Sequence, residues 1–476
     1  MKRDNCYKVY DERALAELEA VAGDYRRYLD AAKTEREAVR EVIRQAEAAG
    51  YRPLAELTAA GENLSPGAKV YAVCMKKAVA LFRLGRRPLD EGLNILGAHL
   101  DSPRLDIKQN PLFEEGELAF LDTHYYGGIK KYQWVTLPLA LHGVVVKKDG
   151  QVIEINIGED EGDPVFCVTD LLVHLAAEQL EKKGARVVEG EALNILVGNA
   201  AAVFDDNKDN KEDKDNKEEK EKRKATVRGN ILRLLREKYG LAEEDFTSAE
   251  IEAVPAGRAR ECGIDRSMIL AYGQDDSACA YPSLRAMLAV DEAERAACCL
   301  LVDKEEIGSV GATGMESKFF ENALAEVMAL TEEGFSDLRL RRVLQRSRML
   351  SSDVSSAFDP AYGAAFEKKN VAYLGRGLVF NKFTGARGKS GSNDANAEYL
   401  GWLRRVMDEA GVHWQTAELG KVDLGGGGTI AYILALYGME VIDSGVPVLS
   451  MHAPWEVTSK ADVYEAYLGY LAFLRA

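Results

Sequence analysis

The sequence has few cysteines, and their arrangement gives no sign of a disulfide framework. There are seven, an odd number, and no two form a CxxC pair. Small secreted proteins depend on paired cysteines, whereas proteins of reducing compartments keep their thiols free. We therefore expect reduced cysteines and a cytoplasmic location.

Long apolar runs are also missing. No segment approaches the roughly 20 apolar residues that a membrane-spanning helix needs. The first residues, MKRDNCYKVYDERALAELEA, lack the apolar core of a secretory signal. These absences predict a chain with no membrane partner.

An excess of positive charge is absent as well. The 476 residues carry 77 acidic and 61 basic side chains, a net charge of −16. Nucleic-acid binding requires clustered Lys and Arg, so we expect no nucleic-acid partner. A hydrophobic content of 47% is enough for a sizeable core in two or three domains.

One segment cannot contribute to that core. Residues 205–224, DDNKDNKEDKDNKEEKEKRK, consist only of charged residues and asparagine. Such a composition has no apolar surface to bury, so it predicts a mobile charged loop.

The order of expected helices and strands indicates an α/β domain with a β-rich insert. A capping box at Thr34 and Glu37 predicts a helix that ends at Gly50. We expect a second helix over 68–84 and a buried strand over 93–100. The insert, at 103–255, contains a hairpin in which KKDG joins the apolar runs 139–146 and 152–157.

The remainder of the chain alternates between helix and strand patterns. Strands are expected at 298–302, near Leu350, at 371–374 and at 446–450, with helices between them. Such alternation predicts a sheet covered by helices. The predicted domains are 1–102 and 256–476, which together form the catalytic part, and the insert.

Two of the six histidines lie at the ends of predicted strands. His99 lies in GAHLD and His452 in LSMHAP. Side chains at the carboxyl ends of strands project into the crevice where open α/β sheets bind ligands. Each histidine is a candidate metal ligand, although packing alone would also explain either one.

Acidic residues gather at similar positions. Glu305 and Glu306 follow the strand over 298–302, Asp275 and Asp276 precede a helix, and Asp353 follows Leu350. A solvated helix start or an N-cap would also explain the pairs. Together, however, carboxylates and imidazoles without thiolates suit Zn²⁺, Mn²⁺ or Co²⁺ in a hydrolytic site.

Several segments resemble one family of metallopeptidases over nearly the whole chain. They are KTEREAVREVI, NILGAHLDSPRLDIKQNPL, YYGGIKKYQW, AYGQDDSACAYPSL, DKEEIGSVGATGMES, SSDVSSAFDP, GKSGSNDANAEY, KVDLGGGGTIA and SMHAPWEV. In this order they are similar to the aspartyl aminopeptidase and aminopeptidase I family of zinc metallopeptidases, and most of all to its bacterial members. The resemblance implies a mixed-sheet catalytic domain with helices on both faces, interrupted by a β-rich dimerisation domain.

The resemblance also implies a role for each candidate residue. Two zinc ions per subunit, or Co²⁺ or Mn²⁺ in their place, would be held by His99 with Asp353 and by Glu306 with His452. Asp275 would bridge the two ions, with Asp276 as the alternative.

Two further carboxylates complete the implied catalytic set. Glu305 would be the general base for the attacking water. Asp101, two residues from His99, would orient that imidazole.

Other family positions point to the substrate cleft. Gly425–Thr429 lacks the GxxxxGK[ST] pattern of a phosphate cradle. It is either a tight turn into a helix or, as in the family, a cleft wall in which the NH groups of Gly426 and Gly427 contact the peptide. Lys389–Gly391 likewise is either a loop or part of the substrate cleft.

Two positions depart from the family pattern. Aspartyl-specific relatives carry a lysine in the first specificity pocket, and here its place falls on Asn381, with Lys382 adjacent. An acidic and a neutral or broad preference therefore both remain open. Relatives also lend a histidine to a neighbouring subunit. His174 is the candidate, although Asp170 aligns as well and a packed helix-face histidine is the alternative.

The predicted function is removal of N-terminal residues from peptides by a metal-activated water. The alternatives are an amidohydrolase of the same fold acting on N-acyl amino acids, and a non-catalytic self-assembling homologue. The resemblance implies a homo-oligomer, typically a dodecamer built from dimers through the β-rich insert.

Overall fold

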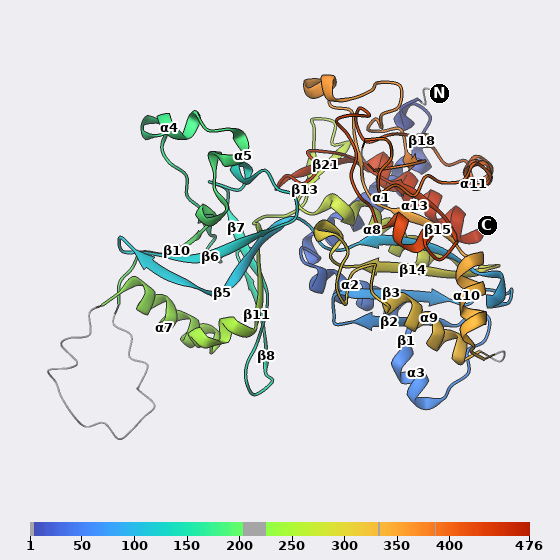
Figure 1. The fold of residues 1–476 in the computed structure, drawn as a ribbon, viewed down its shortest axis with the longest axis horizontal. Helices are drawn as coiled ribbons and strands as arrows, with labels where there is room; N and C mark the ends of the chain where they lie inside the picture. Colours follow the sequence, from blue (N-terminus) through green and yellow to red (C-terminus); the bar gives the residue numbers. More distant parts are fainter. Residues whose placement is uncertain (1–3, 203–224, 332–333, 386) are drawn as a thin grey trace. The chain divides into compact units, whose positions relative to one another are not determined.

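Figure 1 shows the computed structural model, which describes residues 4–202, 225–331, 334–385 and 387–476. The charged segment 205–224 lies outside the described residues. The chain divides into unit 1, Met1–Ser102 with Arg258–Ala476, and unit 2, Pro103–Gly257. The sequence placed the second boundary slightly earlier, after residue 255.

Among the described residues, unit 1 is built on a nine-stranded mixed sheet with the order β1-β2-β3-β14-β4-β15-β19-β17-β18. Its central strands β14, β4, β15 and β19 are parallel, so their carboxyl ends meet at one edge. The strands are β1 (Arg52–Pro53), β2 (Lys69–Cys74), β3 (Ala78–Arg83), β4 (Leu93–His99), β14 (Ala296–Val302), β15 (Arg348–Ser352), β17 (Leu378–Asn381), β18 (Trp414–Thr416) and β19 (Glu440–Gly445).

Helices cover both faces of this sheet (Figure 1). Successive strand residues such as Ile95 and Leu96 belong to different hydrophobic clusters, because strand side chains alternate between faces. One face packs against α1 (Glu12–Ala31), α2 (Glu35–Ala48), α8 (Gln274–Ala289), α11 (Ala397–Glu409) and α13 (Lys460–Arg475). The other packs against α3 (Leu54–Ala60), α9 (Phe319–Ala329), α10 (Asp337–Arg346) and α12 (Ala431–Ala435). The predicted fold class is confirmed.

A smaller five-stranded sheet of unit 1, within the described residues, has the order β12-β13-β21-β20-β16. Its strands are β12 (Arg260–Cys262), β13 (Met268–Ala271), β16 (Ser355–Ser356), β20 (Pro447–Leu449) and β21 (Glu456–Ser459). β13 and β21 pair antiparallel with Ala271 opposite Glu456. The pairing therefore brings the segments after β13 and before β21 together.

Local predictions in unit 1 have mixed outcomes. The helix that begins after Thr34 is confirmed with its capping box, but the helix expected over 68–84 is wrong. β2 and β3 form a hairpin there, with Met75 and Lys76 in the turn at φ 47° and 61°. Hairpin turns with positive φ at both central residues usually have the sequence Asn-Gly. The sequence Met-Lys therefore did not predict a turn here.

The strand expected at 371–374 is also wrong. Only one isolated bridge forms there in the described chain, between Ala357 and Ala372. This bridge directly follows β16 (Ser355–Ser356), the last strand of the five-stranded sheet, and in the described chain the pairing does not extend beyond it.

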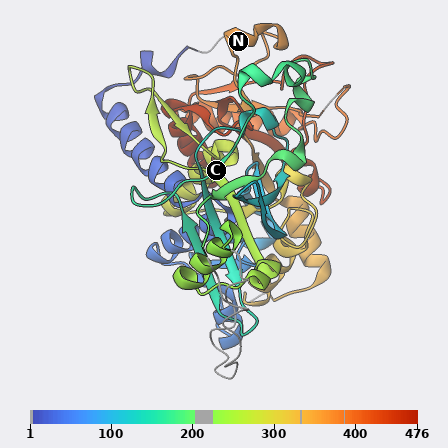
Figure 2. The same cartoon turned by 90° about the vertical axis from the view of Figure 1, so that its left-hand side faces the viewer.

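Unit 2 is an antiparallel sheet, seven-stranded in the described residues, with the order β8-β7-β11-β5-β6-β10-β9. The strands are β5 (Arg104–Glu115), β6 (Leu118–Tyr126), β7 (Leu139–Val146), β8 (Val152–Ile157), β9 (Cys167–Val168), β10 (Ile195–Gly198) and β11 (Ala249–Pro255). The predicted hairpin is the β7–β8 pair. Helix α7 (Val227–Tyr239) lies against β5, β6 and β10 (Figure 2).

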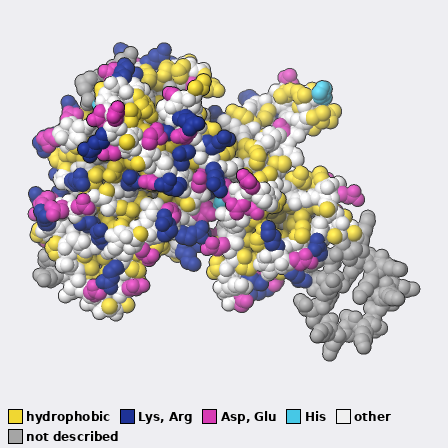
Figure 3. Space-filling model, turned by 180° about the vertical axis from the view of Figure 1, so that it is seen from behind, with side chains coloured by type: hydrophobic (Ala, Val, Ile, Leu, Met, Phe, Trp, Pro, Cys, Tyr) yellow, Lys and Arg dark blue, Asp and Glu magenta, His cyan; other side chains and the backbone are white. Residues whose placement is uncertain are grey.

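One part of unit 2 exposes apolar side chains. It comprises η4 (Val173–Leu175), α4 (Ala177–Leu180) and the residues just before them. Hydrophobic side chains gather at the surface of unit 2 (Figure 3). The most exposed in this segment are Leu171, Leu172, Val173, Leu175 and Leu180, at 47–69%. An isolated subunit would leave this apolar surface in water.

The two ends of unit 1 meet at a buried carboxyl group. Glu465 of α13 accepts hydrogen bonds from the Tyr10 hydroxyl at 2.6 Å and from the His413 backbone N–H at 2.8 Å. Burial raises the pKa of Glu465 to about 7. This carboxyl therefore ties the N-terminal segment to α13.

No helix in the described part of the chain is long and apolar enough to cross a bilayer. All seven cysteines lie in that part and carry free thiols.

Candidate metal centre

The carboxyl edge of the large sheet gathers most of the predicted ligands. β4 ends at His99, β14 is followed by Glu305 and Glu306, and β15 is followed by Asp353. Because these strands are parallel neighbours, their ends lie side by side. The buried strands therefore fix the backbone from which each ligand projects.

Asp275 and His452 come from the small sheet instead. Asp275 follows β13 through Gly273, whose φ of 70° turns the chain into α8. The Ser102 hydroxyl donates to the Asp275 carbonyl oxygen at 2.7 Å and fixes this turn. His452 precedes β21, the strand that pairs with β13.

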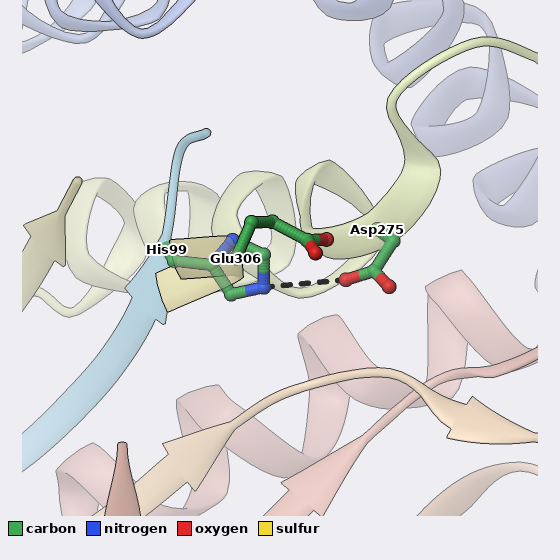
Figure 4. A group of neighbouring side chains, drawn as sticks. All are labelled: His99, Asp275 and Glu306. Carbon is green, nitrogen blue, oxygen red and sulfur yellow. Dashed lines mark ion pairs between the residues drawn. The ribbon is translucent and has the colours of Figure 1, made fainter. Parts of the chain in front are cut away.

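These side chains converge on Asp275. Its Oδ1 lies 3.2 Å from His99 Nε2, and its Oδ2 lies 3.2 Å from His452 Nε2. His452 Nε2 is also 3.5 Å from Glu306 Oε1. Figure 4 shows His99 entering from β4 and Asp275 from the start of α8, with Glu306 beside them. Three sets of donor atoms lie within 4.8 Å of one another: His99, Asp275 and Glu306; His99, Glu305 and Asp353; and Asp275, Asp276 and Asp353.

The backbone of Asp101 assigns the tautomer of His99. His99 Nδ1 lies 2.9 Å from the main-chain oxygen of Asp101 and 3.4 Å from its carboxylate. A carbonyl oxygen only accepts, so Nδ1 carries a proton, and in the neutral imidazole Nε2 keeps a lone pair that faces Asp275 Oδ1. At 3.2 Å, Nε2 and Asp275 Oδ1 are placed to share one cation, either a proton or a metal ion.

The Asp101 carboxylate holds the segment that carries Glu305 and Glu306. Its Oδ1 accepts the backbone N–H of Glu305 and its Oδ2 accepts that of Glu306, both at 3.1 Å. Asp101 is fully buried. The residue that sequence reasoning assigned to orienting His99 therefore also fixes both adjacent glutamates.

Electrostatics show how strongly this cluster concentrates negative charge. Burial raises the pKa of Glu306 and Asp353 well above their ordinary values, and neighbouring carboxylates raise them further. Burial lowers the pKa of His99, but Asp101 and Asp275 outweigh it and hold that pKa well above its usual range. Burial also acts to raise the pKa of Asp275, yet the two histidines keep it below its usual range.

The donor set fits zinc. Asp275 Oδ1 and Glu306 Oε1 are buried and receive no hydrogen bond, as expected of oxygens that bind a cation. Imidazole and carboxylate donors without thiolate are typical of catalytic zinc sites. His452 is about one-third exposed, so the site opens to solvent on its side.

Sequence reasoning missed Glu456. This buried residue accepts the backbone N–H of His452 at 2.8 Å and that of Asp275 at 3.0 Å. Burial raises its pKa to about 8. The only signal in the sequence was a glutamate just after the SMHAP segment, at the start of a strand.

Asp276 lies behind the cluster. Its Oδ2 accepts the backbone N–H of His99 at 3.3 Å, whereas Asp275 directs both of its oxygens toward histidines. Of these two aspartates, Asp275 therefore presents both of its carboxylate oxygens to the histidines of the cluster.

The remaining candidate residues lie in loops. Lys382 is exposed directly after β17, and Gly426 and Gly427 are half-buried in the turn before α12. The Gly427 oxygen accepts the backbone N–H of Gly385 at 3.0 Å. His174 is exposed in η4 of unit 2.

The fold and the centre define a class. A mixed α/β sheet carries imidazoles and carboxylates at its carboxyl edge, with a buried glutamate beside them, and this is the arrangement of a metal-dependent hydrolase.

Comparison with known proteins identifies the family. The model of the peptidase M18 family, aminopeptidase I zinc metalloproteases, matches residues 28–474. A probable M18 family aminopeptidase 1 from Clostridium acetobutylicum is 57% identical over 99% of this chain and 97% of its own length. The crystal structure of an M18 aminopeptidase from Thermotoga maritima superposes with a TM-score of 0.90 at 42% identity, covering 100% of this chain and 99% of the other.

The chain belongs to the M18 family, and it is an aminopeptidase of this group of zinc metalloproteases. The family and function predicted from the sequence are confirmed. The N-acyl amidohydrolase and the non-catalytic homologue are not favoured.

Proposed function

We propose that the chain removes N-terminal residues from peptides at a pair of zinc ions, with cobalt or manganese as possible substitutes. His99 and Asp353 would hold one ion, Glu306 and His452 the other, and Asp275 both. The observation that carries this proposal is the position of Asp275, whose two oxygens each face a different imidazole at 3.2 Å. A carboxylate in that position suits two cations better than one.

Glu305 is the proposed base. Bound zinc would supply an acidified water and polarise the scissile carbonyl. Glu305 would take the proton of the attacking water and return it to the leaving amine. Burial raises the pKa of Glu305, which brings it closer to the pH at which the base must exchange protons.

The experiment combines metal counting with a base variant. Glu305→Gln should retain the wild-type metal content, since Gln leaves the proposed ligands intact, and should lose nearly all turnover of aminoacyl-anilides. Elemental analysis of purified protein should give two zinc ions per chain. One ion per chain would reject the paired centre, and unimpaired kcat in Glu305→Gln would reject the base.

The preferred N-terminal residue depends on the start of the loop after β17. Asn381 is buried at the end of this strand, and Lys382 is exposed. A buried amide carries no charge to select an acidic side chain, so we favour a neutral or broad preference. An anilide panel that compares Asp, Glu, Leu and Ala tests it.

Self-association through unit 2 is the second part of the proposal. The exposed apolar residues around η4 and α4 would be covered in a dimer, and dimers would build a dodecamer. The yeast mApe1 dodecamer shares the fold, with a TM-score of 0.74 at 18% identity. The exposed His174 would then reach a neighbouring subunit's site. Sedimentation of Leu172→Asp with Leu175→Asp should show smaller species than wild type.

We also propose a cytoplasmic location. Seven free thiols, several of them buried, are compatible with a reducing compartment. Cell fractionation with an antibody against the chain tests this assignment.

A further inference from the structure

A basic pocket lies between two segments of unit 1. One wall comes from residues 383–385 and 387–389, just after β17, and the other from residues 418–425, at the glycine-rich turn. The cavity measures about 270 Å³. The hydrogen bond from Gly385 N–H to the Gly427 oxygen ties its loop to that turn.

Positively charged side chains dominate the lining of this basic pocket. Arg387, Lys389 and Lys421 line it together with one carboxylate, Glu418. Lys389 Nζ lies 3.1 Å from Asp394 Oδ2. No ion pair joins Arg387 or Lys421 to a carboxylate anywhere in the described ranges. In a chain of net charge −16, the lining therefore carries a local excess of positive charge, which attracts anions.

The backbone holds these cations in an uncommon conformation. Arg387 and Lys389 have φ of 40° and 66°, on either side of Gly388 at 75°. Side chains other than glycine, asparagine and aspartate seldom occupy this region. In the opposite wall, a Cβ on Gly425 would lie 1.6 Å from the Leu419 oxygen, so only glycine fits. Such strain in a loop is typical of a functional site.

The start of one wall and the end of the other adjoin residues that contact the strands of the large sheet or the segment after Asp353. Asn381, at the end of β17, accepts the Ser355 hydroxyl at 3.4 Å, and Ser355 lies two residues after the ligand Asp353. Asn381 is also paired across the sheet with Asp443. Asp443 in turn accepts the hydroxyl of Thr429, at the end of the glycine-rich turn, at 2.5 Å. The basic pocket is thus connected to the ligand-bearing edge of the sheet from both sides.

We propose that the basic pocket binds a carboxylate of the peptide substrate, on the part that follows the scissile bond. This inference rests on the proposed peptide cleavage and adds a substrate preference to it. Guanidinium and ammonium groups suit a carboxylate. A short peptide offers one at its C-terminus, and a downstream Asp or Glu side chain offers the same chemistry.

The first test removes the pocket's unpaired charges. The double variant Arg387→Gln with Lys421→Gln is compared with a control pair of exposed cations outside the pocket, Lys369→Gln with Arg405→Gln. Substrates are leucyl di-, tri- and tetrapeptides with a free or an amidated C-terminus. At one length the wild type should prefer the free acid by about tenfold or more, mainly through KM. This preference should fall toward unity in the pocket variant and at high salt, but not in the control.

A second series identifies the source of the carboxylate. Amidated peptides with Asp in place of Asn after the scissile bond should be preferred instead if a side chain is the ligand. Equal rates in both series, or a preference that survives in the pocket variant, would overturn the proposal. Leucyl anilide, which has no carboxylate, should be cut equally by all variants. Failure of the wild type on the anilide would instead overturn the proposed peptide cleavage itself.

Discussion

Asp101 offers a direct test of how the segment with the proposed base, Glu305, is held. Its two carboxylate oxygens accept the N–H groups of Glu305 and Glu306, each at 3.1 Å, in a fully buried position. Asp101→Asn keeps the shape of the side chain but replaces one acceptor with an NH₂ group. One backbone N–H then faces another donor and loses its partner.

The magnitude follows from the kind of hydrogen bond that is lost. A bond to a charged acceptor contributes about 1.5–3 kcal/mol, and the unsatisfied buried donor remains. If this energy holds the base in its productive position, kcat/KM should fall by roughly 10- to 150-fold. The metal content should change little, because Asn leaves every proposed ligand in place and its main-chain oxygen still accepts from His99.

The assay compares Asp101→Asn with wild type for kcat/KM on leucyl anilide, bound zinc and thermal unfolding. Asp11→Asn is the matched control, since it makes the same atomic change at an exposed helix N-cap where Asn serves equally well. A folded, zinc-loaded Asp101→Asn enzyme with kcat/KM within about twofold of wild type would refute the reasoning.

Three further predictions concern Glu456, Glu465 and Gly143. Glu456→Gln leaves one of two ligand-segment N–H groups without an acceptor and should weaken zinc binding by roughly 10- to 100-fold, measured by competition with a chelator. The pKa of Glu465 is about 7 in the folded chain, whereas its ordinary value is 4.5. Between these two pH values the folded chain keeps a proton on Glu465 that the unfolded chain has released. The free energy of unfolding should therefore fall by at most roughly 3 kcal/mol as pH rises from about 4.5 to about 7. Glu465→Gln, whose amide can donate to Tyr10, should remove this slope in denaturant titrations; an unchanged slope would assign it to another group. Gly143→Ala should lower the melting temperature, because its Cβ would lie 1.9 Å from a backbone oxygen at φ 140°, whereas Gly116→Ala meets no atom and should have a smaller effect.

Many residues of the candidate metal centre could be predicted from the sequence because they lie at or just after the ends of strands. A run such as Leu93–His99 is mostly apolar and fully buried, so its composition indicates a strand and His99 is found at its end. The same holds for Glu305 and Glu306 after β14. The hydrophobic pattern does not give the order of the strands in the sheet. The proposed role of Asp275 as a ligand shared by two metal ions came from the family resemblance and not from residue spacing.

Positions that depend on main-chain hydrogen bonds were harder to predict. The side chain of Glu456 accepts N–H groups from two segments that only the β13–β21 pairing brings together. The Met75–Lys76 turn depends on positive φ values, and Met and Lys are not residue types that predict such a turn. In both cases the controlling interaction is backbone geometry, which a side-chain pattern does not encode.

The same distinction separates the two roles of Asp101. Sequence reasoning placed its carboxylate next to His99, but the nearer acceptor is its main-chain oxygen, at 2.9 Å against 3.4 Å. That backbone contact leaves both carboxylate oxygens for the Glu305–Glu306 segment. Asp101 therefore has two contacts with different roles. Its main-chain oxygen orients the imidazole of the proposed ligand His99, and its carboxylate positions the proposed base Glu305. Because these two contacts are chemically separate, Asp101→Asn should reduce turnover while zinc stays bound, and loss of both together would show that they are not independent.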